Sequence, residues 1–309
     1  VFVKTKFDIN HETKQQSFRN VLARSGVGAE SIRRFQEVIL YYYRYRGRSF
    51  PWRLTREWYP VLVSEIMSQQ TQVARVLPKF EAFLSRFPEA ETLAKAKGSE
   101  VTRAWQGLGY NRRGLGLQRC VREVLEHFDG ELPNSEEHLL SLPGVGPYTA
   151  AALQVFVFNS PVVVVETNIR AVLIYFFLAA DSSDGRHCDK TISEAEIFEL
   201  ASRVRCLKDS HRWNSAMMDY GAMLKARGFK SNHLVDGYKK QSQFKGSFRQ
   251  VRGAVLRTLS KEGALSGRAL NANLKTEVKA SARQAKEATK ALLEEGFIVK
   301  REGSYQLSD

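Results

Sequence analysis

The stretch Leu142-Pro-Gly-Val-Gly-Pro-Tyr-Thr149 decides the fold of this chain, because it joins a tight turn to the start of a helix near Tyr148. Gly144 and Gly146 flank Val145 and allow the backbone to approach a ligand closely. The N–H groups at the start of the next helix can bind a phosphate. The stretch therefore predicts a helix-hairpin-helix corner that binds a polyanion through its backbone, and an ordinary connection between two helices explains it equally well.

A lone acidic residue follows seventeen positions later, in the segment Val165-Glu166-Thr-Asn168. This segment directly precedes a predicted helix over residues 169–178. Glutamate and asparagine at the start of a helix commonly cap its N–H groups, so capping is the first interpretation. The second is that the Glu166 carboxylate stabilises positive charge that develops on a sugar during a reaction.

A second acidic residue, Glu65, lies on a predicted apolar helix between Val63 and Ile66. Burial there would raise the pKa of its carboxyl group and equip it to donate a proton. A buried pair with an arginine is the alternative. The helix is followed by four amide or hydroxyl side chains, those of Gln69, Gln70, Thr71 and Gln72. Such side chains could fill the gap left by an extruded base, and a solvated polar run is the simpler explanation.

The composition favours a nucleic acid as the partner of this chain. Its 47 lysines and arginines outnumber 33 aspartates and glutamates, which gives a net charge of +14 and a pI near 9.7. Such a charge suits a polyanion, with nucleic acid as the first candidate and an anionic membrane as the second. We find no apolar run that could span a bilayer and no signal-peptide core. We therefore expect a cytoplasmic protein, associated with the nucleoid if the organism is a prokaryote.

The three cysteines, Cys120, Cys188 and Cys206, are far apart in the sequence and form no close-spaced pair. They predict neither a disulfide framework nor a cysteine-rich metal site. Small buried side chains are the simplest interpretation of all three.

Helical periodicity dominates residues 30–237, where strand alternation is scarce. Glycine and proline divide this segment into short helices with brief connections. We therefore expect an all-α core over residues 30–237, preceded by a weakly structured N-terminal arm over residues 1–29. The β-branched run Val162–Val165 could be a short strand, and we favour a buried approach to the following helix.

The character of the chain changes over residues 238–309. Helical patterns over residues 249–259, 266–274 and 281–295 precede two short strands around a Glu302-Gly303 turn, which together describe a small winged-helix domain. This segment holds 15 lysines and arginines and 7 aspartates and glutamates, a net charge of +8. Such a charge on a helix-turn-helix-like unit favours DNA docking, and a solvated face on a protein-interaction module is the alternative.

Six segments of the chain resemble motifs of the helix-hairpin-helix DNA glycosylases, in the same order and spacing. They are Phe50-Pro-Trp-Arg53, Ser64-Glu-Ile-Met-Ser-Gln-Gln-Thr-Gln-Val73, Gly107-Leu-Gly-Tyr110, Leu142-Pro-Gly-Val-Gly-Pro-Tyr-Thr149, Glu166-Thr-Asn168 and Asn214-Ser-Ala-Met-Met-Asp-Tyr-Gly-Ala222. The resemblance covers about residues 30–228 and is strongest to the MutY-type adenine glycosylases. It implies a core of two helical subdomains that bind DNA between them and flip a nucleotide into a pocket.

The resemblance also implies roles for individual residues. Glu65 would protonate the leaving purine, and Glu166 would stabilise the oxocarbenium-like sugar, with Asn168 and Tyr148 beside it. The pocket for the flipped base would be lined by Trp52 and Arg53. Contacts with the DNA would come from Gln69, Gln70, Thr71, Tyr110, Leu142, Gly144, Val145 and Gly146. The hairpin would often hold a monovalent cation through backbone carbonyls, and no metal is expected on side chains.

The chain departs from the family pattern at several positions. Bifunctional relatives carry a Schiff-base lysine where this chain has Tyr148, so we expect no β-lyase activity. The family acid before the asparagine is normally aspartate, and Glu166 is one methylene longer, which alters a tightly held geometry. Lys225 stands where the first of four iron–sulfur cysteines would fall, so we expect no cluster and no other cofactor. A basic winged helix replaces the β-rich domain that reads 8-oxoguanine.

Together these observations predict a monofunctional glycosylase of base excision repair that hydrolyses the N-glycosidic bond of a purine, most simply adenine in a mispair. The partner would be double-stranded DNA with a damaged or mispaired base, and we expect a monomer with no membrane association. One alternative is a glycosylase for hypoxanthine, uracil or mismatched thymine. The other is a non-catalytic protein that binds distorted DNA.

Overall fold

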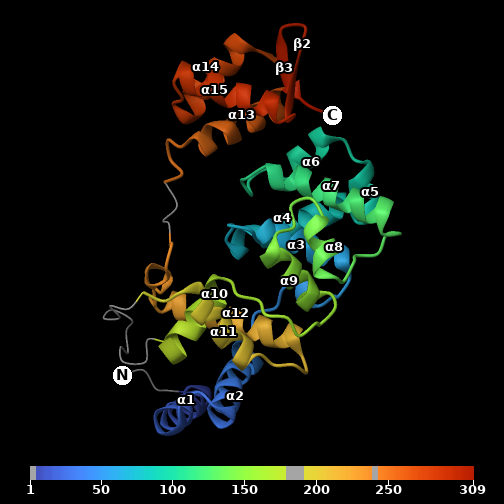
Figure 1. Cartoon of the computed structure of the whole chain (residues 1–309). Helices are drawn as coiled ribbons and strands as arrows, with labels where there is room; N and C mark the ends of the chain where they lie inside the picture. The colour runs from blue at the N-terminus through green and yellow to red at the C-terminus, as the bar shows by residue number, and fades with distance from the viewer. Residues whose placement is uncertain (1–4, 179–190, 239–242) are drawn as a thin grey trace. The chain divides into compact units, whose positions relative to one another are not determined.

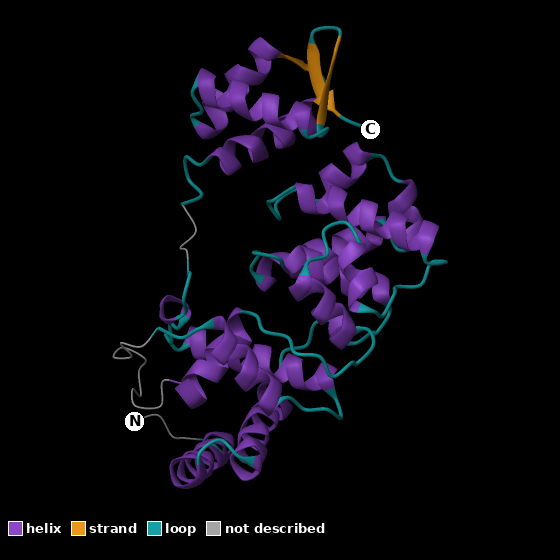
Figure 2. Cartoon of the chain, viewed as in Figure 1, coloured by secondary structure: helices purple, strands orange, loops and turns teal. Residues whose placement is uncertain are grey.

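The computed structural model describes residues 5–178, 191–238 and 243–309. Helices make up most of these residues, and a small sheet lies near the C-terminus (Figure 2). The all-α prediction is therefore confirmed. Cys120 is buried, as the simplest interpretation required, but Cys206 is only half-buried, and Cys188 lies outside the described residues.

The chain divides into two compact units, each built from two separate segments. The first unit comprises residues 1–56 and 150–239, and the second comprises residues 57–149 and 240–309. The division near residue 150 falls within helix α9 (Pro147–Phe156). The predicted arm, core and winged helix are consecutive segments of the sequence and do not correspond to these two units. Their boundaries remain a prediction.

The described residues of the first unit form helices joined by loops, with a parallel β-bridge between Ile192 and Val235. Its main helices are α1 (Lys6–Ser25), α2 (Ala29–Arg46), α10 (Thr167–Leu173), α11 (Glu194–Val204) and α12 (Ser210–Ala226). Three shorter turns are η1 (Pro51–Arg53), η2 (Ile174–Leu178) and η3 (Asn232–Leu234). In Figure 1 the N-terminal helices α1 and α2 carry blue colours, and α10 to α12 carry yellow ones. Helix α12 packs against both α2 and α10, so it forms the centre of this unit.

The N-terminal arm is not weakly structured, because residues 6–25 form α1. Thr5 and Asp8 cap this helix reciprocally: the Asp8 N–H donates to Thr5 Oγ1, and the Thr5 N–H donates to Asp8 Oδ2. Phe18 and Val21 are buried, and the ring of Phe18 packs at a tilt against Phe35 of α2 and edge-on against Phe176 of η2. The expectation was wrong because the apolar stripe has few members and the many polar residues on the opposite face conceal it.

The approach to α10 over residues 162–165 contains no strand, as the sequence analysis favoured. Val164 is buried there, so the run serves as a buried connection. Helix α12 lies very close to the start of α10. A Cβ placed on Gly221 would lie 2.1 Å from the carbonyl oxygen of Asn168, so only glycine permits this packing.

The second unit contains the remaining core helices and the winged helix. Its core helices are α3 (Trp58–Ser68), α4 (Val73–Arg86), α5 (Ala90–Lys95), α6 (Gly98–Ala104), α7 (Arg112–His127) and α8 (Glu136–Ser141). Helix α7 packs against α3, α5 and α6, and its buried residue Gly114 lies directly against the Trp105 side chain that follows α6. Helix α3 is mostly buried, as its largely apolar sequence predicts.

The winged helix forms as predicted, with boundaries shifted by a few residues. Its elements are α13 (Phe248–Glu262), β1 (Leu265–Ser266), α14 (Gly267–Val278), α15 (Ala282–Glu294), β2 (Ile298–Arg301) and β3 (Ser304–Leu307). The antiparallel sheet has the order β1-β3-β2, and Ile298 pairs with Leu307. Strand β1 was not predicted, because two residues are too few to show an alternating pattern. Leu115 of α7 packs against the apolar core of this domain.

Candidate functional site

The hairpin turn is built on two buried anchors and two open glycines. Leu142 and Val145 are buried, and the Val145 N–H donates to the Leu142 carbonyl oxygen at 3.1 Å. Gly144 has a φ of +82°, a conformation that favours glycine. A Cβ on Gly144 or Gly146 would have no neighbouring atom within 4 Å, so this backbone faces open space. The turn is thus shaped for contact through its backbone, while its binding role stays a prediction.

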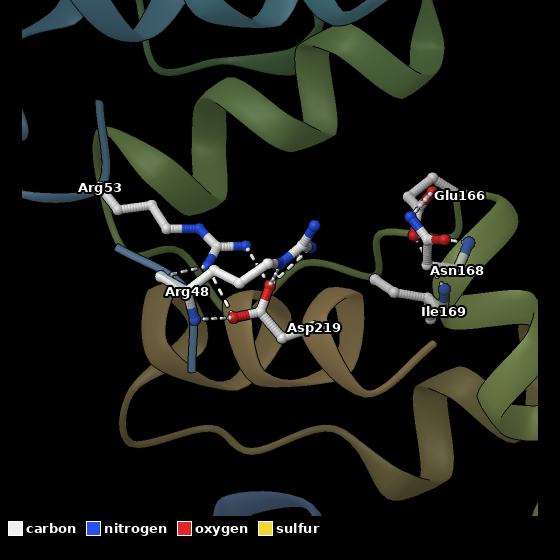
Figure 3. Close-up of polar contacts among 6 residues, drawn as sticks. All are labelled: Arg48, Arg53, Glu166, Asn168, Ile169 and Asp219. Carbon is white, nitrogen blue, oxygen red and sulfur yellow. Dashed lines mark hydrogen bonds and ion pairs between the residues drawn. The ribbon is translucent and has the colours of Figure 1, made fainter. Parts of the chain in front are cut away.

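Glu166 caps helix α10, so the capping interpretation is correct for this structure (Figure 3). Its Oε1 accepts hydrogen bonds from the N–H groups of Asn168 at 2.7 Å and Ile169 at 2.8 Å. Its Oε2 accepts from Asn168 Nδ2 at 3.0 Å. Shorter side chains usually occupy this position, and the additional methylene of glutamate is accommodated because the side chain curls back over the first helical turn. Whether the same carboxylate also meets a sugar remains a prediction.

A lysine lies next to this cap. Lys225 of α12 donates from Nζ to Thr167 Oγ1 at 2.9 Å, and Thr167 Oγ1 donates in turn to Glu166 Oε2 at 3.2 Å. Burial lowers the pKa of Lys225, while the Glu166 carboxylate acts in the opposite direction. The position singled out as lacking a cluster cysteine therefore holds an ammonium group that is linked to Glu166 through one hydroxyl.

The segment with the predicted base-pocket residues is held by a buried carboxylate, Asp219 of α12. Arg53 binds both carboxylate oxygens of Asp219 at 3.0 Å, and Arg48 Nε binds Oδ1 at 2.7 Å (Figure 3). The Arg53 side chain is only 9% exposed, and the Trp52 ring stacks on Phe50 with 5.0 Å between ring centroids. The structure thus gives Arg53 a positioning function in this segment.

Asp219 was missed as a functional residue, although its motif was recognised. The sequence did contain a signal for it, namely an acidic residue in an otherwise apolar stretch of α12, beside buried neighbours such as Met217 and Tyr220. A buried acid of this kind requires a cationic partner. The sequence could not show that this partner is a pair of arginines about 170 positions away.

Glu65 lies on α3 and is half-buried, and its neighbours Ser64 and Ile66 are buried. This placement agrees with a carboxyl group on a largely apolar helix. Its raised pKa and its function as a proton donor remain predictions. Tyr148, in the first turn of α9, is 37% exposed.

The polar residues after α3 form a loop that is joined to the hairpin helix. Gln69 Nε2 donates to Thr149 Oγ1 at 3.1 Å, and Thr149 is buried on α9. Gln70 has a φ of +52°, and Tyr110, in the second predicted DNA-contacting loop, has a φ of +44°. Left-handed backbone at residues other than glycine is uncommon and is concentrated at functional sites.

Arg113 of α7 ties these two loops together, and sequence analysis missed it. From the α3 side it binds the carbonyl oxygens of Ile66 at 2.7 Å, Met67 at 3.0 Å and Gln69 at 2.6 Å. From the second loop it binds the carbonyl oxygen of Gly109 at 3.0 Å. Burial lowers the pKa of Arg113 to about 10. Apart from the Thr71 hydroxyl, the hydrogen-bond acceptors given for Arg113 are backbone carbonyl oxygens, which carry no sequence signal, so periodicity and spacing could not reveal this function.

The predicted residues divide between the two units. Glu166, Asn168, Trp52 and Arg53 belong to the first, and Glu65, Tyr148, the hairpin and the two loops belong to the second. Within residues 5–178, 191–238 and 243–309, no three histidine, cysteine, aspartate or glutamate side chains gather as a metal site would require. None of the helices in these residues is both long enough and apolar enough to cross a membrane.

Residues 63–196 match the family model described as HhH-GPD superfamily base excision DNA repair protein. The chain is 31% identical to an adenine DNA glycosylase of Mycolicibacterium smegmatis over 72% of its length and 78% of the relative. It is 35% identical to human adenine DNA glycosylase over 61% of its length and 35% of the relative. It is also 28% identical to the adenine DNA glycosylase of Buchnera aphidicola subsp. Baizongia pistaciae, of which it spans about half, 52%.

Two solved structures share the fold. One is a thermostable thymine-DNA glycosylase, with a TM-score of 0.53 and 24% identity over 74% of this chain and 97% of the other. The second is endonuclease III in a trapped covalent intermediate with DNA, with a TM-score of 0.52 and 17% identity over 72% of this chain and 92% of the other. At these identities the likeness concerns the fold alone.

Proposed function

Since the chain belongs to the HhH-GPD superfamily of base excision DNA repair proteins, we propose that it is a monofunctional DNA glycosylase that releases adenine from a mispair. The observation that carries the proposal is the similarity to the mycolicibacterial adenine DNA glycosylase, which extends over most of both chains. The substrate is double-stranded DNA, and the net charge of +14 favours its binding.

Two carboxyl groups perform the chemistry in this proposal. Glu65, half-buried on the apolar helix α3, donates a proton to the adenine ring, which makes the base a better leaving group. As the bond between base and sugar breaks, positive charge develops on the sugar, and the Glu166 carboxylate stabilises it. Water then adds to the sugar carbon, and Glu65 accepts the proton that this water loses.

The hydrogen bonds around Glu166 support its part in this scheme. Two backbone N–H groups and the Asn168 amide fix its carboxylate in one orientation, so the charge needs no rearrangement of solvent when the sugar becomes cationic. Asn168 therefore acts as a positioning residue in this scheme. Tyr148 places a phenol, in place of an amine, at the helix start, so the reaction ends at the abasic site without strand cleavage.

We also propose that the protein functions without an iron–sulfur cluster. Lys225 stands at the position of the first cluster cysteine in related glycosylases, and its ammonium group binds Thr167. A cationic amine that donates a hydrogen bond at this place is not a ligand for iron.

The test is release of adenine from defined duplexes that hold adenine opposite guanine, 8-oxoguanine, cytosine or thymine, followed by alkaline cleavage at the abasic site. We expect cleavage of the mispaired duplexes by the wild-type protein and none by Glu65→Gln. Glu81→Gln is the matched control, because Glu81 is an exposed acid on the neighbouring helix α4. The same assay is run on duplexes that carry hypoxanthine, uracil or mismatched thymine, and release of one of these bases alone would replace adenine as the substrate. DNA binding without release of any base would identify a non-catalytic protein.

A further inference from the structure

The winged helix is docked onto helices α6 and α7 of the second unit by polar contacts. Glu295, just after α15, accepts a hydrogen bond from Arg112 Nε at 2.8 Å. Asp309 accepts from Ser99 Oγ at 2.7 Å. Gln106 Nε2 donates to the Leu256 carbonyl oxygen at 3.3 Å. These contacts, together with the packing of α13 against α6, make the winged helix part of this unit.

This docking brings one arginine of the winged helix to the loop that ends in Tyr110. Arg249, in the first turn of α13, donates from its guanidinium to the Tyr110 hydroxyl oxygen at 2.6 Å. Its guanidinium carbon also lies 5.6 Å from the centroid of the same ring. The guanidinium carbon of Arg113 lies 5.7 Å from that centroid, so arginines from two different domains lie close to the same tyrosine ring.

Tyr110 combines features of a nucleic-acid contact. Its side chain is 39% exposed, and its left-handed backbone fixes an unusual direction for the ring. An exposed aromatic ring offers a stacking surface for a base, and neighbouring guanidinium groups attract the phosphates on either side of that base. Because Arg249 holds the hydroxyl end of the ring, it restricts how the ring can be presented.

We propose that Arg249 is a positioning residue that holds Tyr110 in the orientation in which its ring meets bound DNA. The winged helix is then part of the surface that separates a target base from its neighbours, in addition to any contribution from its net charge of +8. The proposal deepens the proposed function and rests on it, since base extrusion precedes excision.

The experiment is a double-mutant cycle in the full-length protein with Arg249→Ala and Tyr110→Phe. The duplex carries 2-aminopurine opposite guanine, and its fluorescence rise reports extrusion of that base. In the otherwise wild-type protein, we expect Tyr110→Phe to raise the Kd obtained from this fluorescence change by about tenfold. A loss of this size is typical of a charge-assisted hydrogen bond. The same change should have almost no effect in the Arg249→Ala background.

Two control variants separate positioning from docking and from charge. Arg112→Ala removes a docking contact and leaves the Arg249–Tyr110 pair, and Arg257→Ala removes an exposed arginine of α13 that pairs with Glu277. Both should keep the full effect of Tyr110→Phe. Additive effects of Tyr110→Phe and Arg249→Ala, or an Arg112→Ala variant that behaves like Arg249→Ala, would overturn the proposal.

The cycle is read without excision, so it is independent of the adenine assay. A wild type that extrudes 2-aminopurine with the expected coupling and releases no base would contradict the proposed function and leave the Arg249–Tyr110 proposal intact. A wild type that releases adenine while the two substitutions act additively would support the proposed function and overturn the Arg249–Tyr110 proposal.

Discussion

Gly221 of α12 lies against the backbone of Asn168, and no side chain fits between them. We expect Gly221→Ala to lower the free energy of unfolding by about 3 kcal/mol, because the added methyl group would displace the start of α10. Excision should fall with it, since the same turn orients Glu166. Urea unfolding and single-turnover excision measure the two effects.

The matched control is Gly116→Ala in α7. Gly116 is also a buried helical glycine, but a Cβ there would have no neighbour within 4 Å. This change should alter stability by no more than about 1 kcal/mol, in the stabilising direction that alanine gives in a helix. Equal losses from both substitutions would show that the close approach to Asn168 is not the cause.

The two functions assigned to Glu166 can be separated by substitution. Glu166→Asn retains a side chain that caps helices well but removes the negative charge. We expect its stability to stay within about 1 kcal/mol of the wild type, and its excision rate to fall by at least about a hundredfold, as for loss of a group that stabilises transition-state charge. Glu166→Asp should keep both capping and activity. A fully active Glu166→Asn variant would exclude Glu166 from the chemistry.

The loops joined by Arg113 should loosen when this residue is replaced. Arg113→Met leaves several carbonyl oxygens without their buried donor, and we expect a loss of about 3 kcal/mol in the free energy of unfolding. Limited proteolysis should then cut within residues 69–72 or 107–110. Arg119→Met, an exposed residue of the same helix, is the control and should leave both measurements unchanged.

Docking of the winged helix should weaken in acid. Hydrogen bonds from Arg112, the largest cause, and from Arg252 of α13 lower the pKa of Glu295 from its usual 4.5 to about 2. A carboxyl group with a lowered pKa in the folded state stabilises the fold above its unfolded pKa, and the contribution disappears as the pH falls through the folded value. The stability difference between wild type and Glu295→Gln should therefore shrink from pH 6 towards pH 2. A constant difference over this range would contradict the assignment.

Borohydride trapping tests the absence of lyase chemistry. A glycosylase that uses water as the nucleophile forms no Schiff base, so we expect no covalent complex with an adenine-containing duplex. A trapped complex that disappears in Lys225→Gln would instead identify Lys225, the amine linked to Glu166 through Thr167, as a nucleophile.

Local signals were sufficient to predict much of the fold. The turn at Gly144 and the Glu302-Gly303 turn are both encoded by residues adjacent in sequence, and the observed elements follow them closely. The apolar face of α1 was missed because its few members, Phe18 and Val21 among them, become recognisable only against α2. Periodicity identifies a helix best when the buried stripe is wide.

The candidate site was predictable residue by residue, but its supporting contacts were not. Glu166 could be singled out because an acid before a helix has a small number of physical explanations. Asp219 and Arg113 act through partners that are distant in sequence or that belong to the backbone, so their local surroundings do not reveal them. Such residues become visible only when the chain is folded.

The first unit is assembled from two segments that lie on either side of residues 57–149, and this has a consequence for synthesis on the ribosome. Helix α2 packs against α12, about 170 residues later, so α1 and α2 must wait for most of the core to be translated before they find their partner. Residues 57–149, in contrast, form a continuous segment that leaves the ribosome before residues 150–239 are made. We therefore expect this segment to gain structure while the N-terminal helices still expose apolar surface, which makes these helices the part of the nascent chain most in need of a chaperone.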